Sequence, residues 1–177
     1  TDFEITGCAL KAVSAEKIRV TATVRNTGNV SGKEVVQVYA SLPGGILEKE
    51  AHRLAAYAKT NELKPGEAQE VTMEVKMDGL TSYDEKRAAW ILESGFYGIW
   101  VGNSLASAKL CGGIKLDQEV IRRQVRNLFP LKQELEEISQ EASKTAKRAA
   151  AAAQQAKEEE LTVLNIRGAD IATETVE

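Results

Sequence analysis

The sequence predicts a mainly β protein, an immunoglobulin-like antiparallel β-sandwich followed by a C-terminal α-helical extension. Three observations lead to this prediction. Apolar and polar residues alternate with a period of two in several short runs of the first two-thirds of the chain. Turn signals separate about seven such runs, the number of strands typical of an immunoglobulin-like sandwich. After Leu116 the composition changes to a helical pattern rich in alanine and charged residues.

The strands are predicted in order from their alternation and from the turns between them. Residues 17–25 alternate most clearly, with four apolar side chains on one face and charged or hydroxyl side chains on the other. Residues 70–77 repeat this pattern soon after Pro65 and Gly66, a pair that presets a turn. Residues 34–42 carry large side chains on both faces, so we expect a central strand covered on both sides. The expected strands are 3–13, 17–25, 34–42, 54–63, 70–77, 97–101 and 106–116.

The helical extension is predicted from capping residues and apolar spacing. Asp117 is a favourable N-cap for a first helix that reaches Leu128. Pro130 then stands where the start of a second helix tolerates proline. The stripe of that helix is Leu131, Leu135, Ile138, Ala142, Ala146, Ala149, Ala153 and Ala156. The expected organisation is a sandwich over residues 1–117, a helical extension or interdomain connector over 118–164, and a polar tail or linker over 165–177.

Composition and charge argue against several classes of partner. The 177 residues are 43% hydrophobic and 28% charged, with a formal net charge of −3. These values are typical of globular domains, and the small net charge gives no reason to expect nucleic acid. No run approaches the roughly 18 to 20 consecutive apolar residues of a membrane span, so we expect no membrane partner. The first residues lack an initiator methionine and a basic segment, so we expect a piece of a larger protein. The sequence does not identify its compartment and slightly favours the cytoplasm.

The two cysteines, Cys8 and Cys111, are too few for a disulfide framework. They lie near the two ends of the predicted sandwich and could meet in space, but we expect two buried thiols. With one histidine, His52, and distant cysteines, the sequence has no ligand set for zinc. We expect no metal and no cofactor.

Residues 24–39 contain the most specific pattern in the chain. Asn26, Thr27 and Gly28 are typical of a turn, because asparagine bonds its own backbone and glycine accepts positive φ. The segment VRNTGNVSGKEVVQVY resembles the fibronectin type III-like domain of family 3 glycoside hydrolases, and the resemblance continues over most of residues 15–105. The matching residues, taken as structural, are Asn26, Thr27, Gly28, Gly32, Glu34, Gln37, Tyr39, Lys59, Pro65, Gly66, Glu67, Tyr83, Trp90, Gly95, Tyr97 and Gly102.

The resemblance implies an accessory, non-catalytic role. In family 3, a retaining mechanism uses an aspartate nucleophile on a barrel domain and a glutamate acid/base on an α/β domain. This chain contains neither domain, so the implied partners are flanking catalytic domains of a β-glucosidase-like parent. Roughly 60 residues follow the predicted sandwich. That length favours the variant in which the module lies between the α/β domain and the barrel. The Arg-Pro pair often found before the leucine that matches Leu54 is absent, and His52-Arg53 stands there instead.

No group of residues in the sequence predicts catalysis. Asp84 and Glu85 are adjacent carboxylates, and on a strand they would point to opposite faces and could not act as a catalytic pair. We therefore interpret them as part of a solvated loop. The basic residues Arg122, Arg123 and Arg126 are interpreted as a salt-bridging helix face. We therefore expect no catalytic residue.

Two alternative functions remain open from the sequence. The sandwich could bind carbohydrate through an exposed aromatic such as Trp90 or Trp100, although we expect the tryptophans and tyrosines to pack mainly in the core. The alanine-rich helix over 130–165 could pack on the sandwich, on a missing domain or on a second copy as a homo-oligomer. Its few large apolar residues make packing on its own chain the first expectation.

Overall fold

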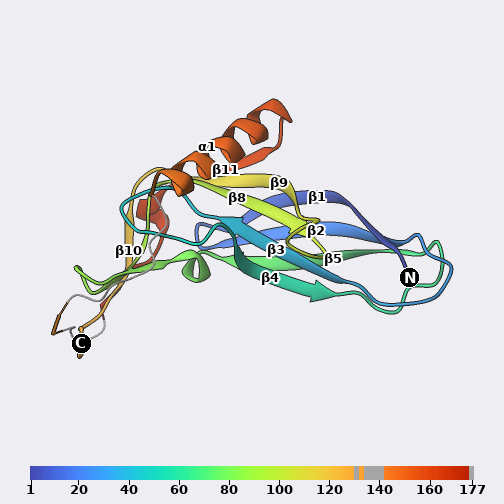
Figure 1. The fold of residues 1–177 in the computed structure, drawn as a ribbon, viewed down its shortest axis with the longest axis horizontal. Helices are drawn as coiled ribbons and strands as arrows, with labels where there is room; N and C mark the ends of the chain where they lie inside the picture. The colour runs from blue at the N-terminus through green and yellow to red at the C-terminus, as the bar shows by residue number, and fades with distance from the viewer. Residues whose placement is uncertain (130–131, 134–141, 176–177) are drawn as a thin grey trace.

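The structure is a computed structural model, and it describes residues 1–129, 132–133 and 142–175. Its body is a sandwich of two sheets, here called the first sheet (order β1-β2-β5) and the second sheet (order β11-β9-β8-β3-β4). A small sheet (order β12-β10-β7-β6) lies at the end of the long axis opposite the N-terminus (Figure 1). The strands are β1 Phe3–Ser14, β2 Lys17–Asn26, β3 Val35–Ser41, β4 Arg53–Lys59, β5 Ala68–Lys76, β6 Ser82–Asp84, β7 Ala89–Leu92, β8 Gly95–Gly102, β9 Lys109–Leu116, β10 Val120–Gln124, β11 Thr162–Ile166 and β12 Glu174–Thr175. The helices are η1 Met77–Leu80, α1 Ala142–Glu158 and η2 Gly168–Asp170.

The core lies between the first and second sheets, as the alternation predicts. Ile18 and Val24 of β2 are fully buried, whereas Arg19 between them is exposed. The second sheet supplies Val38 and Ile99 from the other side. The strand predicted over 34–42 is confirmed as central, because β3 lies between β4 and β8. It is fully covered on one face only, since Val35, Gln37 and Tyr39 on the other face are half-buried.

The helix predicted to begin at Asp117 is wrong, because Val120–Gln124 forms strand β10. This strand pairs antiparallel with β7 and parallel with β12. Val120 is buried in the core, and the β-branched Val120 and Ile121 suit a pleated surface. Pairing with the open edge of β7 therefore outweighs the helical spacing of the local sequence. The small sheet as a whole was not among the predicted strands.

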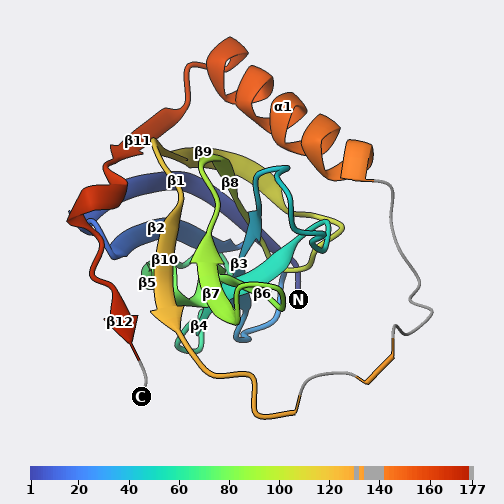
Figure 2. The same cartoon turned by 90° about the vertical axis from the view of Figure 1, so that its left-hand side faces the viewer.

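The alanine-rich helix packs on its own chain. Helix α1 contacts β8 and β9, and Figure 2 shows it lying across the second sheet on the side away from the first. Its buried residues are Thr145, Ala149, Ala152 and Ala156. The predicted stripe is correct at Ala149 and Ala156 but wrong at Ala146, which is exposed. Leu131, Leu135 and Ile138 lie outside the described residues.

The segment after α1 returns to the sandwich. Strand β11 pairs parallel with β9, from Thr162 opposite Gly112 to Ile166 opposite Leu116. Ile166 is buried, and so is Ile171, which follows η2. The expected polar tail over 165–177 thus contributes apolar side chains to the core. The boundaries of the three expected parts remain predictions.

The expectation of two free thiols is wrong. Cys8 and Cys111 form a disulfide with a Cα–Cα distance of 5.8 Å. Each cysteine lies at a break in strand pairing, Cys8 between Thr6 and Ala9 of β1, and Cys111 opposite the Ile99–Trp100 irregularity of β8. A β-bulge re-aims side chains, which period-two alternation cannot reveal.

The expectation that the large aromatic residues pack in the core is correct for Tyr97, which is 1% exposed, but wrong for others. Trp90 is 41% exposed and Tyr57 is 71% exposed. Trp100 lies on the outer face of β8 beside α1, with its Nε1 donating to Ser41 Oγ at 3.0 Å. None of the described helices is long and apolar enough to cross a bilayer.

Candidate functional site

The motif residues around Asn26 form a hydrogen-bonded turn cluster at one end of the sandwich. Asn26 is fully buried, and its Nδ2 donates to Val30 O and to Leu63 O, both at 2.9 Å. Its Oδ1 accepts from Gly28 N at 3.0 Å, and its backbone bonds to Gly66 and Glu67. A single asparagine therefore joins the turn after β2 to the turn before β5. The motif residues brought together here are Asn26, Thr27, Gly28, Gly32, Pro65, Gly66 and Glu67.

A second group of motif residues lies along the outer face of β3. Glu34 accepts from Val35 N at 2.8 Å and from Asn103 Nδ2 at 3.1 Å. Gln37 donates to Asn103 O at 3.0 Å and accepts from the Tyr39 hydroxyl. These bonds connect β3 to the turn after β8, where a Cβ on Gly102 would approach the backbone of Ala108 to 2.7 Å. Lys59 lies apart from them, exposed at the end of β4. Glu34 and Gln37 thus hydrogen-bond to neighbouring backbone.

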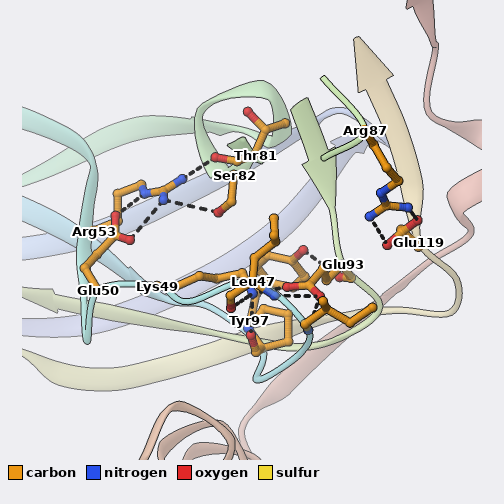
Figure 3. Close-up of polar contacts among 12 residues, drawn as sticks. Leu47, Lys49, Glu50, Arg53, Thr81, Ser82, Arg87, Glu93, Tyr97 and Glu119 are labelled. Atoms are coloured by element: carbon orange, nitrogen blue, oxygen red, sulfur yellow. Dashed lines mark hydrogen bonds and ion pairs between the residues drawn. The ribbon is translucent and has the colours of Figure 1, made fainter. Parts of the chain in front are cut away.

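The end of the sandwich next to the small sheet contains a buried ion pair, drawn in Figure 3. Lys49 and Glu93 are 5% and 6% exposed, and their side chains contact each other directly. Lys49 Nζ also donates to Pro43 O at 3.2 Å and Leu47 O at 3.1 Å. Glu93 Oε1 accepts from Ile46 N at 2.6 Å, so both charges are hydrogen-bonded as well as paired. The pair thus bonds to the backbone of Pro43, Ile46 and Leu47, while the Ile46 side chain is 85% exposed.

The motif residues Gly95 and Tyr97 complete this cluster. The Tyr97 hydroxyl donates to Glu93 O at 2.7 Å, and burial of the phenol, followed by the negative charge of Glu93, raises the pKa of Tyr97 above its ordinary value. Gly95 has φ +133°, and a Cβ there would lie 2.7 Å from Pro43 Cβ. The close approach and the backbone conformation both require glycine at this position.

Two arginines, Arg53 and Arg87, pair with three carboxylates near the small sheet, and Figure 3 draws the pairs with Glu50 and Glu119. Arg87 donates to Asp84 Oδ2 at 2.5 Å and to both oxygens of Glu119 at 2.6 and 3.0 Å. These hydrogen bonds lower the pKa values of Asp84 and Glu119. Arg53 pairs with Glu50, lowers its pKa in the same way, and donates to Thr81 O at 2.6 Å. The solvated-loop interpretation is correct for Glu85, which is exposed in the turn after β6, but wrong for Asp84, which is buried at the end of β6 and paired with Arg87.

None of these clusters has the geometry of an acid/base or nucleophilic site. The carboxylates described above accept hydrogen bonds from arginine, lysine or backbone N–H groups. The lowered pKa values of Glu50, Asp84 and Glu119 favour the ionised form, which cannot donate a proton. Burial, followed by the charge of Arg148, lowers the pKa of His52. Within the described ranges, no group of three His, Cys, Asp or Glu side chains could hold a metal ion. The ion pairs and hydrogen bonds of these clusters connect turns and loops to the strands.

Sequence reasoning missed Lys49 and Arg87. Lys49 lies in a charged run, Glu48 to Arg53, that looks like a solvated loop, and only the fold reveals its burial. Arg122 and Arg123 were expected to form salt bridges, and they do so with Asp78 at 3.3 Å and Glu174 at 3.1 Å, from a strand and not a helix.

Four side chains form a row across the exposed face of the small sheet, here called the aromatic strip. Tyr83, Trp90, Arg123 and Glu174 are successive cross-strand partners from β6 to β12. The rings of Tyr83 and Trp90 are 5.3 Å apart with a 49° tilt. A hollow of about 240 Å³ adjoins Trp90 and Arg123. The strip presents aromatic surface beside charged groups.

Comparison with known proteins agrees with this geometry. The sequence profile described as "Fibronectin type III-like domain" matches residues 34–105. β-Glucosidase A of Butyrivibrio fibrisolvens is 43% identical over 118 residues, which are 64% of this chain and 14% of that protein. The β-glucosidase of Ruminococcus albus is 37% identical over 137 residues, 74% of this chain and again 14% of that protein. The chain therefore spans about one-seventh of the length of these relatives.

Solved structures show the same partial match. β-Glucosidase 3B of Thermotoga neapolitana, in complex with glucose, superposes with a TM-score of 0.62 and 36% identity, covering 67% of this chain and 16% of that one. A β-glucosidase of Paenibacillus barengoltzii gives a TM-score of 0.64 and 30% identity, covering 71% and 15%. The motif, the sandwich and both kinds of match agree, and this chain carries a fibronectin type III-like domain of the kind found in β-glucosidases of glycoside hydrolase family 3.

Proposed function

We propose that the chain is a non-catalytic accessory module of a family 3 glycoside hydrolase, and that it supports flanking catalytic domains. The observation that carries this proposal is the partial match, since the chain aligns with 14% of the length of its relatives. The clusters described above support it, because their charged side chains form ion pairs and hydrogen bonds that fix turns and loops. The parent would hydrolyse terminal β-glycosidic bonds by a retaining mechanism, with both carboxylates on the flanking domains.

We also propose that the module lies between the α/β domain and the barrel, with residues 118–164 as the connector and the part of 165–177 that follows the buried Ile171 as a linker. The length of chain after β9 supports this order. In the structure the connector is attached to the sandwich, because β10 pairs with β7 and β11 pairs with β9. Such a connector would hold the next domain at a defined orientation.

The experiment is an assay of the purified chain on aryl β-glucosides, with a family 3 β-glucosidase as positive control. We expect no turnover from a chain whose cooperative urea unfolding shows that it is folded. Hydrolysis with retention of anomeric configuration, at a rate that scales with chain concentration, would contradict the proposal.

Carbohydrate binding is the second candidate function, and the aromatic strip is the observation that favours it. Trp90 is the more exposed of the two tryptophans, and polar groups that can bond to hydroxyls lie beside it. Titration with cello-oligosaccharides in a Trp100→Phe background makes Trp90 the reporter. Saturable fluorescence change would support binding. The change must persist in Tyr57→Ala, which removes an exposed aromatic elsewhere, and an unchanged signal in all titrations would exclude this function.

Self-association through the C-terminal helix was the remaining possibility. The small residues of α1 pack on β8 and β9, so its buried face is occupied within the chain. We propose that α1 acts within the chain and not between copies. Sedimentation should show a monomer with and without residues 130–165, and a dimer that depends on this region would contradict that proposal.

A further inference from the structure

A pocket of about 290 Å³ lies between α1 and the outer face of the second sheet. Its size is at the lower end of the range for small-molecule sites. Trp100, Leu105 and Ala152 provide apolar walls, and His52, Arg148 and Gln155 provide polar groups. The pocket therefore combines an aromatic surface with a few hydrogen-bonding groups, and the accessory role proposed above makes no use of it.

The indole of Trp100 is held in place from two sides. Its Nε1 donates to Ser41 Oγ at 3.0 Å, and the ring of His52 meets it edge-on at 5.3 Å with an interplanar angle of 84°. Helix α1 packs closely on β8 next to this indole, since a Cβ on Gly98 would lie 3.3 Å from Ala152 Cβ. A preformed aromatic wall reduces the entropy cost of binding a flat ring.

The polar groups of the pocket select for negative charge. Neither ring nitrogen of His52 has a hydrogen-bond partner among the described residues. Arg148 projects from α1 and donates from Nε to Lys144 O at 3.2 Å. A guanidinium has five N–H donors and can bind a ligand oxygen alongside its present partners. Among the described residues that line the pocket, Arg148 is the charged one and none is acidic.

We propose that this pocket binds a small aromatic carboxylate, with the ring against Trp100 and the carboxylate at Arg148 and His52. Guanidinium and carboxylate form strong, charge-assisted hydrogen bonds. The pocket volume of about 290 Å³ accommodates one aromatic ring. This site is separate from the aromatic strip, which lies on the small sheet.

The test is a titration of the ¹⁵N-labelled full chain carrying Trp90→Phe, in which the single indole N–H signal belongs to Trp100. The probe is 4-hydroxybenzoate, and 4-hydroxybenzyl alcohol is the neutral analogue with the same ring. Acetate supplies the charge without the ring, and glucose tests for a sugar. We expect a saturable shift with 4-hydroxybenzoate and a shift at least about tenfold weaker with each of the others.

Two substitutions in α1 test which positive side chain binds the carboxylate of the probe. Arg148→Gln should weaken 4-hydroxybenzoate binding at least about tenfold, the loss expected for one charge-assisted hydrogen bond. Lys144→Gln removes an exposed positive charge one turn earlier and should leave the affinity unchanged. Unchanged backbone signals of β8 and β9 will show that both variants keep α1 in place. Absence of a shift, equal affinity for the neutral analogue, preferential binding of glucose, or equal losses in the two variants would overturn the proposal.

Discussion

Lys49 and Glu93 contribute most among the individual residues, because a buried charge is stable only when it is paired and hydrogen-bonded. Both side chains are almost inaccessible, and between them they bond to four backbone groups of the loop residues Pro43, Ile46 and Leu47 besides each other. Removal of either partner leaves the other charge buried without compensation. The loop conformation and the position of Ile46 therefore depend on this pair.

Lys49→Met and Glu93→Gln should each destabilise the chain by about 3–5 kcal/mol, the usual cost of breaking a buried ion pair. Urea unfolding of both single variants and the double variant measures this, and the double variant should lose less than the sum because the two groups act together. Lys33→Met, at an exposed lysine, is the matched control and should change stability by less than about 0.5 kcal/mol. Additive losses would contradict the coupling.

Arg87 makes stability depend on pH. It lowers the pKa values of Asp84 and Glu119 below their unfolded values, so its contribution is present above about pH 4.5 and disappears as the pH falls through the folded values. Arg87→Gln should be less stable than the parent chain at pH 7, and the difference should shrink below pH 4.5. Urea midpoints at pH 7, 5, 4 and 3 measure this.

Arg167→Gln, at an exposed arginine, is the control for Arg87→Gln and should follow the parent chain at every pH. A difference between Arg87→Gln and the parent that stays constant down to pH 3 would show that the contribution of Arg87 is not electrostatic.

Helix α1 illustrates how an element with few large side chains can still pack closely. Its buried residues are one threonine and three alanines, and β8 beneath it presents Gly98, where a Cβ would lie 3.3 Å from Ala152 Cβ. Small residues on both surfaces let the helix backbone approach the sheet. The many van der Waals contacts formed at this short distance stabilise the packing without large side chains. The alanine-rich sequence also has high intrinsic helix propensity.

Ala152→Leu should disrupt this packing. Ala152 is 3% exposed, and a larger side chain there would be forced against Gly98, at a cost of about 1–3 kcal/mol. Hydrogen exchange of the α1 amides should become faster while β2 and β5 keep their protection. Ala150→Leu, the same change on the exposed side of the helix, should leave exchange unchanged. Equal effects of the two substitutions would mean that α1 does not pack through this face.

The disulfide links the two sheets of the whole sandwich. Cys8 and Cys111 are separated by 103 residues, and β1 and β9 belong to different sheets. Closing a loop of this length stabilises a domain by about 4–5 kcal/mol in the chain-entropy model. Because it spans most of the sandwich, the link restricts the unfolded chain more than a local bridge would.

Reduction, or the double change Cys8→Ser and Cys111→Ser, should therefore lower the free energy of unfolding by about 2–5 kcal/mol. Urea unfolding with and without a phosphine reductant measures the loss, and the double variant should not respond to the reductant. Titration of the unreduced, denatured chain should detect no free thiol. Two reactive thiols per chain would contradict the bond.

Alternation, turn residues and the 24–39 motif suffice to predict the sandwich, its central strand β3, the buried face of β2 and the relationship to family 3. Each of these depends on residues close together in the chain, where side-chain period and turn chemistry are local properties.

The remaining features depend on contacts between distant segments. Pairing with β7 makes Val120–Gln124 a strand, two bulges bring Cys8 to Cys111, and Glu93 accounts for the burial of Lys49. The pocket at Trp100 forms because α1, distant in sequence, packs against β8. Local patterns carry no information on which partner a segment meets, since the free energy of such contacts arises only when the whole chain has folded.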